Sequence, residues 1–66
     1  MRVTINGSPR EVPDGTTVAQ AVRILTTATT GVAVALNDEV VTRGSWDTTA
    51  LGDSDRVEVL TAVQGG

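Results

Sequence analysis

The stretch Arg56-Val57-Glu58-Val59-Leu60-Thr61-Ala62-Val63 (RVEVLTAV) opens with alternating polar and apolar side chains and passes directly into Gln64-Gly65-Gly66. An alternation of period two is typical of a β-strand with one face in a core. The pattern therefore predicts a last strand over residues 56–63 with Val57 and Val59 pointing inward. The glycines that follow have the least conformational preference of any residue, so we expect the packed body to end there.

The beginning of the chain predicts a hairpin. Residues 2–5 alternate in the same way, and Asn6-Gly7 is a strong signal for a two-residue turn. Residues 10–12 should then pair back onto the first strand. Pro13-Asp14-Gly15 is typical of a turn and should end the second strand.

A helix should follow this turn. Thr17-Val18-Ala19-Gln20 fits a capping box, which marks the helix start. The threonine-rich residues 26–30 and Gly31 should end the helix. Between these limits one apolar stripe at helical spacing predicts one packing partner, and it consists of Val18, Ala21, Val22 and Leu25.

Two further strands are indicated after the helix. Residues 32–36 form an apolar run, and Asn37-Asp38 is a turn signal that leads into residues 39–41. We expect residues 42–55 to be irregular. Trp46 is interpreted as a cover for one edge of the core, with ligand stacking as the alternative.

The order ββαβ(β)β predicts an α+β fold over residues 1–66, with one helix across one face of a mixed four- to five-stranded sheet. One helix covers only one face, so the other face is solvated or held for a partner. Strand alternation places four aliphatic side chains on that second face. These candidate partner-surface residues are Ala33, Ala35, Leu60 and Ala62.

Composition narrows the classes of function. A chain of 66 residues has little room for an internal active site, and it contains no His, Cys, Lys or Tyr to act in catalysis or to bind zinc. Its net charge of −3 and single aromatic residue argue against nucleic-acid binding. No apolar run approaches the roughly 20 residues of a membrane span. We therefore expect a cytoplasmic carrier, adaptor or subunit that is not an enzyme and binds neither cofactor nor metal, with Asp53 and Asp55 explained by a turn.

The chain resembles the bacterial sulfur carriers of thiazole (thiamin) biosynthesis, which are ubiquitin-like β-grasp proteins. The resemblance covers the whole chain. Its most specific parts are the final Gly65-Gly66, the strand before them, and the pattern V-V-x-R-x-x-W from Val40 to Trp46. Two loop positions depart from the family pattern, because Thr42 stands where proline is common and Ser54 stands where glycine is usual.

The resemblance implies a carrier whose chemistry is at Gly66. The α-carboxylate is ionised at neutral pH and is a poor electrophile, so it needs activation. The family's partner is an E1-like adenylyltransferase that uses ATP to adenylate this carboxylate, after which sulfur from a donor such as a cysteine desulfurase gives a thiocarboxylate. Thiazole synthase would accept the sulfur. Residues 63–66, with Gln64 and Gly65 leading to Gly66, would span roughly 12–14 Å if extended.

Two alternatives stay open at the level of sequence. The chain could supply sulfur for molybdopterin or cysteine synthesis instead, although those relatives tend to be longer. It could also be a ubiquitin-like protein modifier joined through Gly66 to a lysine of another protein. Because the chain has no lysine, it could not then be extended by its own copies.

Overall fold

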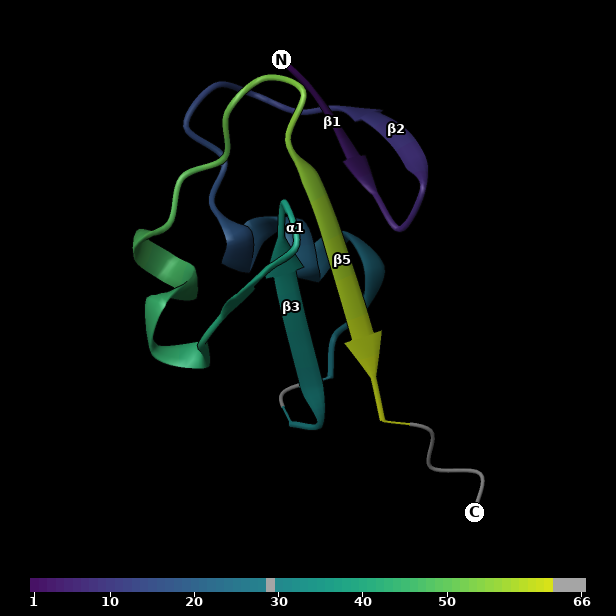
Figure 1. Ribbon diagram of the computed structural model, residues 1–66, viewed down its shortest axis with the longest axis vertical. Coiled ribbons are helices and arrows are strands. Elements are labelled where there is room, and N and C mark those ends of the chain that lie inside the picture. The colour runs from purple at the N-terminus through teal and green to yellow at the C-terminus, as the bar shows by residue number, and fades with distance from the viewer. Residues whose placement is uncertain (29, 63–66) are drawn as a thin grey trace.

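The computed structural model describes residues 1–28 and 30–62, and it contains one mixed sheet with a helix across one face (Figure 1). The elements follow the chain in the order β1 (Arg2–Ile5), β2 (Ser8–Glu11), α1 (Val18–Leu25), β3 (Val32–Leu36), β4 (Glu39–Val41), the 3-10 helix η1 (Arg43–Thr48) and β5 (Arg56–Thr61). The predicted fold class is confirmed.

The first hairpin forms around Asn6 and Gly7, whose φ values of 50° and 82° are those of a type I′ turn. A two-residue turn makes Ile5 and Ser8 partners, so β2 begins at Ser8. The predicted pairing of residues 10–12 is confirmed for Arg10 and Glu11, and the strand begins two residues earlier than predicted. Val12 lies just beyond β2, although its N–H still donates to the carbonyl of Met1 at 2.9 Å.

The helix begins as predicted. The Thr17 hydroxyl accepts a hydrogen bond from the Gln20 N–H, and the Gln20 side chain accepts one from the Thr17 N–H. The helix ends at Leu25, where Thr26 takes an extended conformation. Leu25 is 38% exposed, so its expected place in the buried stripe was wrong. The buried side chains of α1 are Val18, Ala21 and Val22, and the helix residues after them are exposed.

The segment after β4 is more ordered than predicted. Residues 43–48 form η1 instead of an irregular loop, and the Ser45 N–H closes its start on the carbonyl of Thr42. Trp46 accounts for the formation of η1. Its side chain is only 6% exposed, and its indole N–H donates to the Val41 carbonyl at 2.9 Å, so it holds this segment against the core. One buried side chain leaves no periodic signal in a sequence. The expectation that Trp46 covers the core is confirmed.

The strand order in the sheet is β2-β1-β5-β3-β4, so the last strand of the sequence is the middle strand of the sheet. In Figure 1 β5 lies beside β3, with α1 behind them. β5 pairs parallel with β1 and antiparallel with β3. The structure assigns β5 to residues 56–61, and the predicted strand end at Val63 lies outside the described residues.

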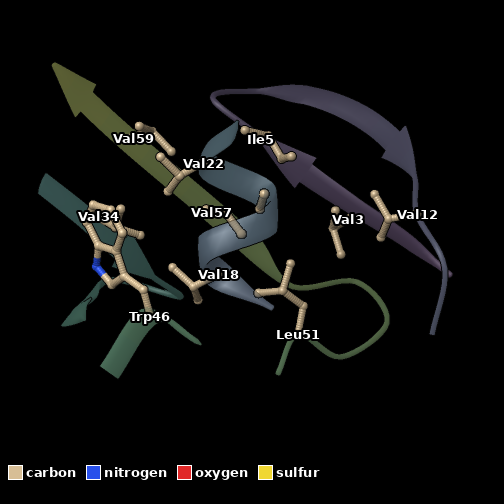
Figure 2. Close-up of a cluster of buried hydrophobic side chains, with 11 residues drawn as sticks. Val3, Ile5, Val12, Val18, Val22, Val34, Trp46, Leu51, Val57 and Val59 are labelled. Carbon is tan, nitrogen blue, oxygen red and sulfur yellow. The ribbon is translucent and has the colours of Figure 1, made fainter. Parts of the chain in front are cut away.

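The core lies between the sheet and α1, as Figure 2 shows. β5 contributes Val57 and Val59, which point inward as predicted and are 1% and 4% exposed. Trp46 of η1 and Leu51 of the following loop are also buried in this core. No helix within residues 1–28 and 30–62 has the length and apolar character to cross a membrane.

Candidate partner surface and terminal segment

The sheet face opposite the helix carries an apolar groove of about 450 Å³. Leu60 of β5 and Val40 of β4 are 71% and 79% exposed beside it. Exposed aliphatic side chains gathered along one apolar groove mark a candidate contact surface. The groove is lined by Asn6, Ala33, Val34, Ala35, Val40, Glu58, Val59 and Leu60.

The strand register explains why this face is hollowed. Leu60 lies opposite Ala33, and Ala35 lies between Val40 on one side and Glu58 on the other. The two alanines on β3 are short, whereas their neighbours on β4 and β5 are long. A row of small side chains between two rows of larger ones leaves a trough along β3.

Three of the four predicted surface residues come together in this groove. Leu60, Ala33 and Ala35 line it, whereas Ala62 is exposed but does not line it. The structure brings Ala62 to Gly31 instead, and the Ala62 N–H donates to the Gly31 carbonyl at 2.7 Å. Gly31 has a φ of 70°, and a Cβ on it would lie 3.0 Å from the Ala62 Cβ, so both backbone conformation and space favour glycine there.

Sequence reasoning missed Val40, Glu58 and Asn6 as members of the groove. The signal for Val40 was present, because a two-residue turn at Asn37-Asp38 dictates that Val40 pairs with Ala35. Asn6 carried no such signal. Its place beside the groove depends on the contact between β1 and β5, which are far apart in sequence.

One end of the outer face carries an exposed ion pair. The Arg56 guanidinium donates from Nη2 to Asp38 Oδ2 at 2.7 Å. This hydrogen bond and the adjacent positive charge lower the pKa of Asp38 below its ordinary value and raise the pKa of Arg56. The pair joins the β3–β4 turn to the start of β5.

The acidic loop before β5 is a turn, as expected. Asp53 Oδ1 accepts the Arg2 N–H at 2.9 Å, and the two Asp55 oxygens accept the Gly52 N–H and the Asn37 side-chain amide. Within residues 1–28 and 30–62 no three acidic side chains gather in a way that could hold a metal ion. The carboxylates of Asp53 and Asp55 accept hydrogen bonds that stabilise the conformation of this loop.

The motif from Val40 to Trp46 also has a structural explanation. The Arg43 guanidinium lies over the Trp46 ring at 4.8 Å from its centroid. This stacking covers the outer side of an indole whose N–H is already bonded to β4. The V-V-x-R-x-x-W pattern therefore fastens η1 to the sheet edge.

The predicted modification site and its approach, Gln64, Gly65 and Gly66, lie outside the described residues. Ala62 is the last residue that the structure describes. Its hydrogen bond to Gly31 continues the pairing of β5 with the β3 side of the sheet by one residue beyond Thr61. The chain thus reaches the segment 63–66 directly from the central strand.

A five-stranded mixed sheet of this order with one helix across it defines a β-grasp domain, the ubiquitin-like class of small α+β proteins. A crystal structure and a solution NMR structure of a thiamine biosynthesis protein (ThiS) from Geobacter metallireducens are both 36% identical to the chain. The crystal structure has a TM-score of 0.79 and covers 100% of both chains. The NMR structure has a TM-score of 0.80 and covers 100% of this chain and 88% of the other.

Sequence comparison leads to the same family. The model of the ThiS family matches residues 3–66, so the chain belongs to the ThiS family. A thiazole synthase of Magnetococcus marinus is 35% identical over 66 residues, which are 100% of this chain. The chain spans only 20% of the length of that curated relative. The resemblance to the sulfur carriers of thiamin biosynthesis is confirmed at the level of the family.

Proposed function

We propose that the chain is a sulfur carrier that delivers sulfur for the thiazole ring of thiamin through a thiocarboxylate on Gly66. The observation that carries the proposal is the family match, which extends from residue 3 through Gly66 and so includes the final glycines. The groove on the outer sheet face supports it with a surface on which a partner can dock.

The chemistry follows from the poor reactivity of a carboxylate. One Gly66 carboxylate oxygen attacks the α-phosphorus of ATP, and pyrophosphate leaves, which gives an acyl-adenylate. A persulfide sulfur from the donor then attacks the carbonyl carbon and expels AMP, and a thiol of a partner protein cleaves the S–S bond of this acyl disulfide, which releases the thiocarboxylate and leaves a disulfide on the partner. The resulting thiocarboxylate carries a soft, nucleophilic sulfur atom on a protein that partners bind by shape. Glycines at 65 and 66 suit this task because a chain without Cβ atoms enters a narrow active site.

Catalysis of these steps belongs to the partner proteins. The chain has no His, Cys, Lys or Tyr, so it lacks the side chains that most often act as bases and nucleophiles. The proposed partners are an E1-like adenylyltransferase with its ATP, a sulfur donor such as a cysteine desulfurase, and thiazole synthase. The match to a thiazole synthase of M. marinus supports the last of these.

Intact mass spectrometry tests the proposal. The protein is isolated from its own cells and, separately, incubated with the adenylyltransferase, ATP and a sulfur donor. We expect a species heavier by the difference between one sulfur and one oxygen atom, located on Gly66 by fragmentation. The proposal requires Gly66 to bear the free α-carboxylate, and the mass of the untreated chain checks this directly.

Other outcomes distinguish the alternatives. Large adducts on other proteins would indicate a protein modifier and contradict the carrier function. A strain that lacks the protein should grow when supplied with thiazole or thiamin. Rescue by cysteine or by a molybdopterin product instead would overturn the assignment of thiazole synthase as acceptor.

A further inference from the structure

The two backbone edges of β5 are paired over different lengths. On one edge β3 pairs with residues 57–61. On the other edge the register with β1 stops at Ile5 and Val57, because the chain turns away at Asn6-Gly7. The second half of β5 therefore has no strand on its β1 side within the described residues.

The side chain of Asn6 fills the first place on this open edge. The Asn6 backbone N–H donates to the Val57 carbonyl at 2.9 Å, as the next residue of a strand would. Its side-chain Nδ2 then donates to the Val59 carbonyl at 3.0 Å, and its Oδ1 accepts the Val59 N–H at 2.7 Å. One amide thus satisfies both backbone groups of Val59. Val59 is 4% exposed, so water cannot easily replace these bonds.

Asn37 is a natural comparison for Asn6. Both asparagines occupy the first position of a two-residue turn with a φ of 50°. The Asn37 Oδ1 also binds β5, but it accepts the N–H of Arg56 at 2.9 Å, at the opposite end of the strand. The same device therefore holds the start of β5 through Asn37 and its second half through Asn6.

We propose that Asn6 is a positioning residue for the terminal segment, because its amide takes the place of the missing β1 residue and fixes Val59 on the strand that leads to residues 63–66. This role rests on the proposed function, in which Gly66 must enter a partner's active site. Nothing in the Asn6-Gly7 turn signal itself indicates it, since the turn needs only the backbone conformation of Asn6.

The placement of Asn6 joins the docking surface to the segment that reacts. Asn6 lines the outer groove together with Leu60 while it binds Val59. A partner seated on the groove would thus contact β5 at Leu60, two residues before Ala62, the last residue that the structure describes. Small errors in the orientation of a reacting group have large effects on rate, so a strand held firmly at Val59 matters for a group further along the same chain.

The test uses Asn6→Gly, which keeps a turn residue suited to positive φ and removes the amide. Asn37→Gly is the matched control at the other turn. Asn6→Asp is a second variant that keeps an acceptor for the Val59 N–H and removes the donor to its carbonyl. Amide hydrogen exchange is measured for all four full-length chains, together with ATP-dependent pyrophosphate release in the presence of the E1-like adenylyltransferase.

In Asn6→Gly we expect the Val59 amide to exchange roughly tenfold faster, whereas Asn37→Gly should speed exchange at Arg56 and leave Val59 unchanged. For pyrophosphate release, we expect kcat to fall roughly tenfold in Asn6→Gly with KM within about threefold of wild type. Asn6→Asp should fall between wild type and Asn6→Gly in both measurements.

Three results would overturn the role of Asn6. They are unchanged exchange at Val59, equal kcat for Asn6→Gly and Asn37→Gly, and a loss confined to KM, which would indicate direct contact with the partner. A wild-type chain that releases no pyrophosphate is a different failure, because it overturns the proposed function itself and the positioning role with it.

Discussion

The inward and outward side chains of β5 differ in burial, chemistry and consequence, although they alternate along one strand. Val57 and Val59 are 1% and 4% exposed and pack under α1, whereas Leu60 is 71% exposed on the other face. On that face Arg56 and Glu58 keep their charges in water. The comparison shows that the buried core lies on one face of the sheet and the proposed docking surface on the other.

The largest expected effect is on the inward face. Val57→Ala should lower the free energy of unfolding by roughly 2–3 kcal/mol, from about 0.8 kcal/mol per buried CH₂ plus the cost of the cavity. Urea denaturation measures this change. Thr61→Ala on the same strand is the control and should change stability by less than about 0.5 kcal/mol. Equal losses of unfolding free energy in the two variants would show that burial on the inward face does not decide stability.

The outward face should lose binding instead. Leu60→Gln removes an exposed aliphatic side chain from the groove, so we expect affinity for the adenylyltransferase to fall about tenfold, or about 1.4 kcal/mol, with little change in stability. Ile24→Gln is the matched control, since Ile24 is 42% exposed on α1 and does not line the groove. Calorimetric titration compares the two variants. If both weaken binding equally, the groove is not the docking surface.

A smaller effect is expected at the turn before β5. Ser54 has a φ of 70°, and its backbone N–H donates to the Arg2 carbonyl at 2.8 Å. A left-handed conformation costs an L-residue about 1–2 kcal/mol, whereas glycine loses about 0.5–1 kcal/mol in entropy, so Ser54→Gly should stabilise the fold by about 0.5–1 kcal/mol. Thermal unfolding measures this gain. A destabilised variant would show that the hydroxyl has a role that the backbone does not reveal.

The smallest effect concerns the exposed ion pair. The hydrogen bond from Arg56, and secondly its charge, lower the pKa of Asp38 below the ordinary value of 3.8 in the folded chain. The resulting stabilisation is fully present above that ordinary value and is lost as the pH falls through the lower, folded-state pKa. Because both side chains are exposed, the change should be slight and should shrink with added salt.

Asp38→Asn is the control for this pH dependence. We expect the variant to lose the extra acid sensitivity below pH 3.8 and to match wild type in salt dependence above about 1 M, where screening is strong. Acid titrations of stability at low and high salt make the comparison. A wild-type chain that gains stability as the pH falls through this range would contradict the sign.

Much of the local structure could be read from the residues because its causes are local. The Asn6-Gly7 and Asn37-Asp38 turns, the Thr17 capping box and the inward Val57 and Val59 all depend on neighbours within a few positions. The exceptions have a common cause. Trp46 organises η1 through one long-range burial, and Leu25 is exposed because the helix ends there, which a periodic pattern does not reveal.

The candidate site was predictable only in part for the same reason. Alternation alone placed Ala33, Ala35 and Leu60 on one face, and the structure gathers them in the groove. Ala62 lies one residue beyond β5, where it is exposed and does not line the groove. The expectations for Gln64, Gly65 and Gly66 lie outside the described residues and stay predictions.

The sequence by itself determined which segments become strands and helix, which side chains each presents inward, and where two asparagines make the chain turn. Only the tertiary structure decided that the last strand is the central one and that the Asn6 amide, 53 positions away, binds Val59. The physical reason is that turns and alternation depend on short-range sterics. The order of the strands and the bond from the Asn6 amide to Val59 depend on which distant segments pair with the same backbone groups when the core forms.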